Sequence, residues 1–377
     1  MGPAGPTGPT GPTGRLWGVA VTSGLLGATL ALGAVVLLGQ LGGTTTERIV
    51  ERVGVRDQLG DAFTLRTSPG LPDIVASVDP SVVRLAVESA AGSSAGAGVV
   101  VLDDGHIITN AHVVADARTV TIVLADGTTV AGEVVGIDEV TDLALIVARD
   151  DGLDSSGHSA RDLTWSPAVR GSADDLRIGD PAAVIAPGGT TGNPTVVVGM
   201  VSALQRLVRA GEGAPLHGMI QTDLPVAAGA SGAALCDRTG RVVGIVTPVG
   251  NEEGLGFATP MDAAWAAAEA ILADGEVHHV WLGIEGSDLG ATDSSLLGII
   301  APGGGVVVDR VVPGGPAEAA GLVDGDVLTA VDGVRFATLS QLVVALRGYE
   351  PGDVVALALV RGGNQHEIPV ALGELDG

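Results

Sequence analysis

The sequence contains no lysine, so all 19 basic residues of the 377-residue chain are arginine. Schiff-base and pyridoxal enzymes need a lysine amine, and so do Gly-Lys-Ser/Thr phosphate loops and Ser–Lys hydrolases. The absence of lysine therefore excludes these chemistries.

Aromatic side chains and positive charge are also scarce. Phe, Trp and Tyr together make up 2% of the chain, and 44 acidic against 19 basic residues give a net charge of −25. Proteins that bind nucleic acid neutralise phosphates with clustered positive charge and often stack bases on aromatic rings. We therefore exclude nucleic acid as a partner. The single cysteine, Cys236, cannot form an internal disulfide and is expected to be a buried structural thiol.

A run of 24 residues without charge extends from Leu16 to Gly39. As a helix it would be about 36 Å long, enough to cross a hydrocarbon core of about 30 Å. The alternative is a cleaved signal peptide, which has a shorter apolar region of about 7–15 residues and an Ala-x-Ala-like cleavage site. The run is longer than that and residues 40–43 match such a site poorly, so we expect one transmembrane helix at 16–39.

The segments on either side of this run are polar. Residues 1–15 contain a Gly-x-y repeat that is too short to favour collagen-like assembly over an extended tail, and residues 40–70 are typical of a linker. Arg15 precedes the run, whereas Arg48, Arg52 and Arg56 follow it. By the positive-inside rule, this distribution would place the C-terminal bulk in the cytoplasm.

Short β-rich segments separated by turn residues begin after Leu71. The predicted strands are 81–88, 98–102, 119–124, 128–137, 182–185, 195–200, 218–221 and 242–247, with a hairpin turn at 125–127. Strands at this spacing with almost no helix favour an all-β barrel or sandwich. A helix is predicted at 261–273, ended by Asp274-Gly275, and another at 339–347, capped by Thr338. The predicted secondary structure changes here from almost only strands to a mixture of helices and strands. We therefore expect a domain boundary near 275–280.

Three segments carry candidate catalytic side chains: TNAHVV at 109–114, TDLAL at 141–145 and GASG at 229–232. A hydroxyl nucleophile needs a base to remove its proton, and that base needs a carboxylate to orient it. A tight Gly-x-Ser turn can aim two backbone N–H groups at the attacked carbonyl. The order His112, Asp142, Ser231 is that of the chymotrypsin-type double β-barrel.

The stretch from Pro80 to Pro260 resembles the trypsin-like domain of the HtrA/Deg family of serine proteases, and Trp281 to Ala371 resembles the PDZ domain that follows it. The supporting segments are 96–99, 107–114, 141–145, 176–180, 201–204, 221–223, 256–258, 281–284, 316–322 and 325–326. The resemblance implies a mainly β fold. It would consist of a chymotrypsin-like double β-barrel at 71–275 and an α/β PDZ domain at 278–375, preceded by the single transmembrane helix.

The resemblance also implies roles for individual residues. His112 would be the general base, Asp142 its orienting carboxylate and Ser231 the nucleophile, with the N–H groups of Gly229 and Ser231 forming the oxyanion hole. In the PDZ domain, the N–H groups of Leu282, Gly283 and Ile284 would hold the carboxylate of a peptide C-terminus, with the helix from Leu339 as the other wall of the groove.

The function implied is a membrane-anchored serine endopeptidase that cleaves unfolded or exposed proteins, a role in protein quality control. Anchored enzymes of this family face outward, so the catalytic and PDZ domains are expected outside the cytoplasmic membrane, against the charge count above. Expected partners are polypeptide substrates, peptide C-termini, the membrane and, because the family often forms trimers, two further copies of the chain. No metal or organic cofactor is required. The neighbouring residues His278 and His279 would point to opposite faces of an extended chain and could not chelate together.

The sequence departs from the family pattern at the nucleophile. The family reads Gly-Asn-Ser-Gly-Gly-Pro-Leu, whereas residues 229–235 read GASGAAL. Ala230 lacks a polar side chain that could brace the loop, and Ala233 lacks the freedom of a second glycine. Misplacing a catalytic loop by about 1 Å can cost about 10²-fold in rate. The alternative function is therefore a weakly active or inactive scaffold that binds peptides through its PDZ domain.

The expected substrate pocket lacks charge. Residues 224–228 and 244–247 should line the primary pocket, and neither segment contains a carboxylate. Cleavage after arginine or lysine is therefore disfavoured, and we expect small or medium apolar residues at the cleavage site.

Overall fold

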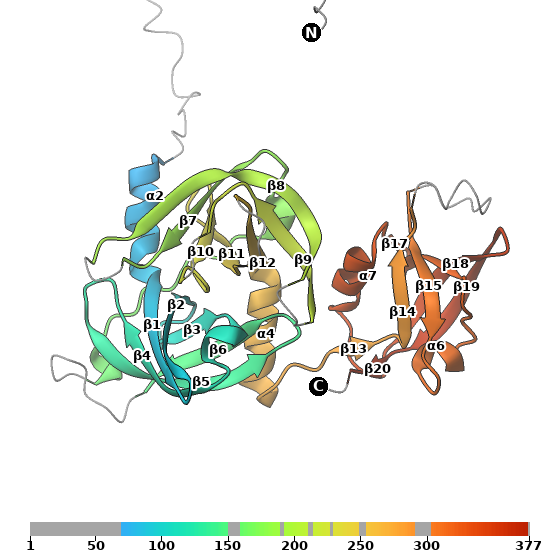
Figure 1. Ribbon diagram of the computed structural model, residues 1–377, viewed down its shortest axis with the longest axis horizontal. Helices are drawn as coiled ribbons and strands as arrows, with labels where there is room; N and C mark the ends of the chain where they lie inside the picture. Colours follow the sequence, from blue (N-terminus) through green and yellow to red (C-terminus); the bar gives the residue numbers. More distant parts are fainter. Residues whose placement is uncertain are drawn as a thin grey trace, which may run out of the picture. The chain divides into compact units, whose positions relative to one another are not determined.

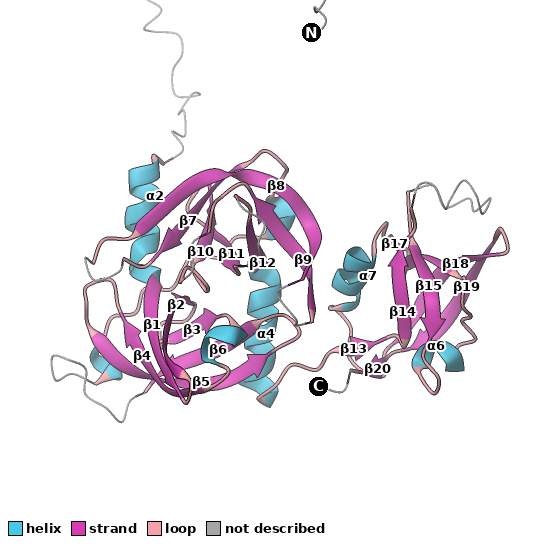
Figure 2. Cartoon of the chain, in the orientation of Figure 1, coloured by secondary structure: helices cyan, strands magenta, loops and turns pink. Residues whose placement is uncertain are grey.

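The computed structural model describes residues 69–149, 159–188, 192–209, 214–226, 229–248, 254–290 and 303–375. These residues form two closed six-stranded barrels and a separate sheet (Figures 1 and 2). The expected mainly β fold with a double barrel and a PDZ-like sheet is confirmed. The predicted transmembrane helix at 16–39 lies outside the described residues. Within the ranges given above, no helix is long and apolar enough to cross a membrane.

The first barrel is built from strands rich in Val, Ile and Leu, which suit a pleated, half-buried surface. Its strands, in spatial order, are β1 (Val82–Ser89), β2 (Gly92–Val100), β3 (His106–Thr109), β6 (Leu143–Ala148), β5 (Thr129–Asp138) and β4 (Ala117–Val123). Antiparallel pairing of β1 with β4 closes the barrel. Leu85, Ile107, Ile122 and Ile146 are fully buried inside it.

The second barrel repeats this architecture. Its strands are β10 (Ala234–Asp237), β11 (Val242–Val246), β12 (Gly256–Pro260), β9 (Pro215–Thr222), β8 (Thr195–Arg209) and β7 (Pro181–Ala186), closed by pairing of β10 with β7. Strand β8 extends nine residues beyond the predicted end at Met200. It pairs with β7 up to Met200 and with β9 from Val201 on, through register irregularities that an alternation pattern does not reveal.

Helix α4 (Met261–Asp274) packs on the cluster of apolar side chains that the two barrels share. Its C-cap residue Gly275 has φ of 87°, the left-handed conformation that glycine adopts at helix ends, so the predicted stop is confirmed. Helix α2 (Leu71–Val78) was not predicted. It buries Ile74 and Val78 in the same cluster.

The C-terminal sheet has the order β14 (Ile284–Asp288), β15 (Val306–Val311), β16 (Val327–Val331), β18 (Val354–Arg361), β19 (Asn364–Ala371), with β17 (Val334–Arg335) beside β16. Strands β13 (Val280–Trp281) and β20 (Gly373–Glu374) pair separately, and helices α6 (Pro316–Ala319) and α7 (Leu339–Leu346) complete the domain. The side chain of Thr338 accepts the N–H of Gln341, which confirms the predicted cap of α7.

Candidate functional site

His112 lies on helix α3 (Ala111–Val114), a single turn that follows strand β3. Ala111, Val113 and Val114 are buried, so the turn is anchored by the residues on either side of the histidine. The His112 side chain itself remains 47% exposed. The buried neighbours therefore fix the turn, while the His112 side chain lies at the surface of the first barrel.

Asp142 comes from the loop between β5 and β6 and faces His112. Both carboxylate oxygens lie 2.9 Å from His112 Nδ1, and Oδ1 also accepts the backbone N–H of His112 at 3.1 Å. Because a carboxylate only accepts, Nδ1 carries the hydrogen and Nε2 is left as an acceptor. Nε2 lies 3.0 Å from Ser231 Oγ. The structure thus joins the three predicted residues in one hydrogen-bonded chain.

Ser231 belongs to the second barrel, in the loop before β10. Its carbonyl oxygen accepts the N–H of Ala97 from β2 of the first barrel at 2.7 Å. The next residue, Gly232, donates its N–H to Val246 of β11 at 2.8 Å. The loop that carries Ser231 therefore makes hydrogen bonds with both barrels.

Gly229 and Gly232 give this loop its sharp turns, with φ of 94° and 83°. A Cβ at Gly232 would lie 2.0 Å from the carbonyl oxygen of Ala97, so the close approach of the two barrels requires glycine there. Within the described parts of the chain, the N–H groups of Gly229 and Ser231 have no hydrogen-bond acceptor. These two N–H groups are the predicted donors of the oxyanion hole.

The two alanines that depart from the family pattern have apolar surroundings. Ala233 is fully buried and Ala230 packs against the apolar cluster inside the second barrel. The Ala233 N–H donates to the carbonyl oxygen of Ala230 at 3.0 Å, and the Val246 N–H donates to that of Ala233 at 2.9 Å. Backbone hydrogen bonds and apolar packing therefore hold the loop where the family pattern offers a polar side chain.

Cys236 lies on β10 and is fully buried, as expected. Burial, with a smaller effect from Asp237, raises the pKa of its thiol to about 12. The thiolate needed for nucleophilic chemistry is therefore absent at neutral pH. Cys236 belongs to the packing of the barrel.

His278 and His279 contact different carboxylates. His278 Nδ1 lies 2.6 Å from Glu374, and His279 Nε2 lies 2.7 Å from Asp138 at the end of β5. Burial alone would raise the pKa of Asp138, but hydrogen bonds from His279 and Thr141 hold it below its ordinary value. Across the described residues, no group of three or more His, Cys, Asp or Glu side chains is placed to hold a metal ion.

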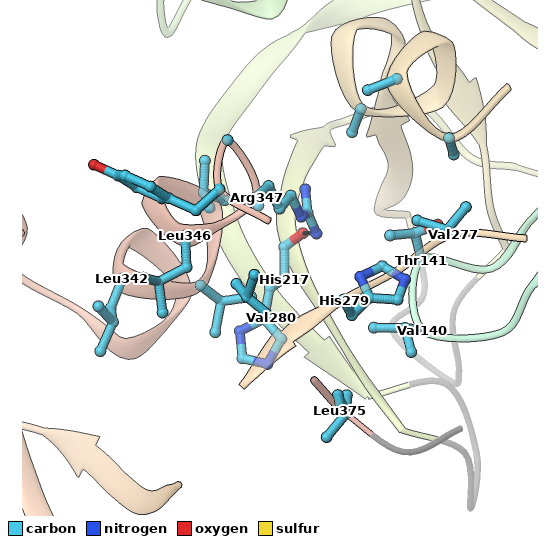
Figure 3. Close-up of a pocket in the computed structure, with 18 of the residues that line it drawn as sticks. Val140, Thr141, His217, Val277, His279, Val280, Leu342, Leu346, Arg347 and Leu375 are labelled. Atoms are coloured by element: carbon cyan, nitrogen blue, oxygen red, sulfur yellow. Dashed lines mark hydrogen bonds between the residues drawn. The ribbon is translucent and has the colours of Figure 1, made fainter. Parts of the chain in front are cut away.

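The predicted PDZ groove is part of a cavity of about 1140 Å³. Its lining includes Leu282, Gly283 and Ile284, together with apolar side chains of α7 such as Leu342 and Leu346. Gly283 has φ of 81°, and a Cβ there would lie 3.0 Å from Pro316 Cδ. The three predicted carboxylate-binding residues and the predicted helix wall thus line one cavity. Figure 3 labels Leu342 and Leu346 of the helix wall.

The same cavity is also lined by residues of β9, a strand that the sequence did not connect with it. Figure 3 labels His217, Arg347 and Leu346 among the residues that line the cavity. Arg347 Nη2 donates to the carbonyl oxygen of His217 at 2.8 Å, and the Gly218 N–H donates to Ser340 Oγ at 2.8 Å. Burial, assisted by Arg347 and Arg209 and opposed by Asp288, lowers the pKa of His217 to about 4. No local pattern in the sequence signals this burial, which depends on residues more than 120 positions apart.

Both folded domains of this chain are similar to domains of known proteins. Family models of a trypsin-like peptidase domain and a PDZ domain match residues 96–245 and 280–372. A probable periplasmic serine endoprotease, DegP-like, of Ectopseudomonas mendocina (strain ymp) is 32% identical over 75% of this chain and 57% of its own length. The putative serine protease HhoA of Synechocystis sp. is 34% identical over 74% of this chain and 71% of its own length. The chain thus spans little more than half of the DegP-like relative.

Solved structures give the same result. The HtrA-type protease AlgW with a tripeptide has a TM-score of 0.68 and 28% sequence identity, covering 82% of this chain and 98% of that protein. The serine endoprotease from Yersinia pestis has a TM-score of 0.57 at 27% identity and covers the same share of this chain. With its double barrel, its His–Asp–Ser chain of hydrogen bonds and its PDZ domain, this protein belongs to the family of HtrA-type serine endoproteases.

Proposed function

We propose that this chain hydrolyses peptide bonds of unfolded or exposed proteins with His112, Asp142 and Ser231 as its catalytic triad. The observation that carries the proposal is the hydrogen-bonded chain from Asp142 through both nitrogens of His112 to Ser231 Oγ, at 2.9 and 3.0 Å. These separations suit proton transfer between a general base and a hydroxyl nucleophile.

In the proposed reaction, Ser231 Oγ attacks the substrate carbonyl carbon as its proton passes to His112 Nε2. Asp142, 13% exposed, stabilises the imidazolium and keeps its tautomer. The oxygen of the tetrahedral intermediate accepts hydrogen bonds from the N–H groups of Gly229 and Ser231. His112 then gives its proton to the leaving amine. Water, activated by the same imidazole, releases the acyl group from Ser231.

The proposed cleavage site is a small or medium apolar residue. Leu224, at the start of the expected pocket wall, is fully buried in the apolar cluster inside the second barrel. Val226 packs against that cluster. Neither supplies a carboxylate for a basic side chain. A digest of a peptide library should therefore yield fragments ending in residues such as Val, Ala or Leu, and a strong preference for Arg or Lys would contradict this.

The PDZ domain is proposed to bind peptide C-termini. The peptide would add a strand beside β14, with its carboxylate on the N–H groups of Leu282, Gly283 and Ile284 and its last side chain in the cavity beside α7. The anchor at 16–39, an outward orientation of the folded domains and a homotrimer complete the proposal. Protease accessibility of tagged termini in intact cells tests the orientation, and sedimentation velocity tests the trimer.

A fluorophosphonate probe distinguishes the proposed protease from an inactive scaffold. The purified chain is incubated with the probe and, separately, with a labelled unfolded protein, alongside Ser231→Ala. We expect wild-type labelling and hydrolysis, and neither in Ser231→Ala. If wild type is not labelled with or without peptides that bind the PDZ domain, the scaffold function replaces the protease function.

A further inference from the structure

Asn110 is a fully buried residue directly before the turn that carries His112. Its side-chain amide makes two hydrogen bonds from one nitrogen. Nδ2 donates to the backbone carbonyl oxygen of Asp142 at 3.1 Å and to Thr247 Oγ1 at 2.8 Å. Because a carbonyl oxygen can only accept, the contact with Asp142 defines which side of the amide carries the hydrogens. One amide group thus contacts both barrels.

The amide does not serve the helix that Asn110 begins. Asn110 occupies the N-cap position of α3, where asparagine usually accepts a backbone N–H of the first turn, but its side chain makes no such bond. Within the described residues, its buried Oδ1 has no hydrogen-bond donor at all. A buried acceptor without a partner is destabilising, so local helix formation does not account for this arrangement.

The contact with Asp142 supports a strained backbone. Asp142 has φ of 55°, the left-handed region that non-glycine residues rarely adopt. Such a conformation persists only where surrounding contacts hold it. Asn110 holds the carbonyl group of Asp142, and the backbone N–H of His112 holds its carboxylate. The two contacts together define where Asp142 sits relative to the imidazole.

The contact with Thr247 reaches the barrel that carries the nucleophile. Thr247 follows β11, is 1% exposed and donates its N–H to Phe257 at 2.9 Å. The preceding residue, Val246, accepts the N–H of Gly232 beside Ser231. The amide of Asn110 therefore connects the backbone of Asp142 with the strand that supports the nucleophile loop.

We propose that Asn110 is a positioning residue of the triad, which fixes the left-handed backbone of Asp142 relative to the second barrel through Thr247. This inference rests on the proposed hydrolytic function. With the amide in place, the imidazole stays aligned between the Asp142 carboxylate and Ser231 Oγ. Without it, Asp142 is free to leave the left-handed conformation, and His112 loses its orientation.

The test measures kcat, KM and the pH dependence of kcat/KM for the full chain with four substitutions. Asn110→Leu removes both N–H donors while keeping four side-chain heavy atoms branched at Cγ. Thr247→Val removes the acceptor, and Thr247→Ser restores it. Thr259→Val is the matched control, because Thr259 is also a 1% exposed threonine of the second barrel but bonds to Met219 Sδ.

For Asn110→Leu we expect kcat to fall about 10²-fold with KM within about twofold, the loss associated with a misplaced catalytic group. The acidic limb of its pH profile should move to lower pH, because a displaced Asp142 stabilises the imidazolium less. Thr247→Val should lose part of kcat and Thr247→Ser should recover that loss, because the serine hydroxyl again accepts the amide N–H. Thr259→Val should resemble wild type. If Asn110→Leu fails to fold, the contrast between Thr247→Val and Thr247→Ser decides.

Two results would overturn the inference. An Asn110→Leu variant with wild-type kcat and pH profile would show that the amide does not position the triad, as would equal losses in Thr247→Val and Thr259→Val. Wild type without Ser231-dependent hydrolysis would instead overturn the proposed function, and the role of Asn110 with it. Failure of this inference alone leaves wild-type hydrolysis intact, so the two failures are distinguishable.

Discussion

The backbone N–H of Ala97 donates to the carbonyl oxygen of Ser231 at 2.7 Å, so a strand of the first barrel holds the proposed nucleophile on the second. The contact brings the Ala97 carbonyl so close that a Cβ at Gly232 would lie 2.0 Å from its oxygen. The bond donated by Thr109 Oγ1 to the same oxygen at 2.7 Å further restricts any movement. Gly232 is therefore a point of close approach between the two barrels at the site.

Gly232→Ala should reduce hydrolysis by at least about 10²-fold, because the loop must move away from Ala97 to admit a methyl group. Gly275→Ala is the matched control. Gly275 has a similar positive φ of 87°, but a Cβ there would meet nothing within 4 Å. The control should lose only about 1–2 kcal/mol of stability from the left-handed backbone and keep full activity. Initial rates and thermal unfolding of both variants check this, and equal activity in the two would contradict it.

Asp142→Asn should lower kcat by about 10⁴-fold with little change in KM, the loss known for this change in a trypsin-like triad. The amide no longer selects the tautomer of His112 that leaves Nε2 free to accept the Ser231 proton. Asp126→Asn serves as the control, because Asp126 is an exposed carboxylate in the β4–β5 turn that caps the Thr128 N–H. Steady-state kinetics on one peptide substrate compares them. A kcat for Asp142→Asn near that of the control would remove Asp142 from the triad.

Cys236 should resist alkylation in the folded chain. Its thiol has a pKa of about 12 and is fully buried, so almost no thiolate is available at neutral pH. Iodoacetamide followed by intact-mass measurement should show no adduct in buffer and one adduct in concentrated urea. Stoichiometric labelling of the folded protein would mean that β10 opens readily and that the barrel is less rigid than its packing indicates.

His217 should make the folded state less stable on acidification. Its pKa is about 4 in the folded chain against an ordinary 6.5. As the pH falls below 6.5, this imidazole becomes protonated in the unfolded chain. In the folded chain it stays neutral until the pH reaches about 4. Stability is therefore lost across this window, and His217 causes no further loss below it.

Urea unfolding between about pH 7 and pH 4 measures this effect, with His217→Gln expected to lose less stability than wild type over the same range. His366→Gln is the control, because His366 is an exposed histidine of β19. The same pH dependence in wild type and His217→Gln would show that the imidazole is as solvated in the folded chain as in the unfolded one.

The groove beside α7 should bind peptides with a free C-terminal carboxylate and an apolar last residue. Amidation of that terminus should weaken binding by at least about tenfold, because the backbone N–H groups would lose a charged acceptor. Val343→Glu, in the cavity lining, should weaken binding, whereas Val334→Glu, at a position 59% exposed on β17, should not. Fluorescence anisotropy with a labelled peptide measures both. Equal affinity for the free and amidated peptides would exclude carboxylate recognition.

Local features of the structure follow from short stretches of sequence. The Thr338 side chain caps α7 and Gly275 ends α4 as their residue types indicate, because capping involves only one turn of backbone. The hairpin between β4 and β5 likewise agrees with its Asp126-Gly127 turn. The barrel strands are predictable from sequence because alternating apolar residues along a strand indicate which side chains face a core.

Features that depend on residues far apart in the chain cannot be predicted from short stretches of sequence. Helix α2 buries Ile74 and Val78 in a cluster between the barrels, and its eight residues alone do not reveal that cluster. The last nine residues of β8 pair with β9 through an irregular register that depends on both strands. The burial of His217 depends on Arg347, 130 residues further along the chain.

The candidate site divides in the same way. The sequence by itself determined which groups are present: an imidazole, a carboxylate and a hydroxyl in the order of a double-barrel protease, with glycines at the turn that aims the hydroxyl. Only the tertiary structure decided that His112 Nε2 approaches Ser231 Oγ to 3.0 Å and that Asn110 contacts Thr247, 137 residues away. The reason is physical: side-chain type and local turn geometry are properties of neighbouring residues, whereas the meeting of two barrels depends on how all their buried side chains pack.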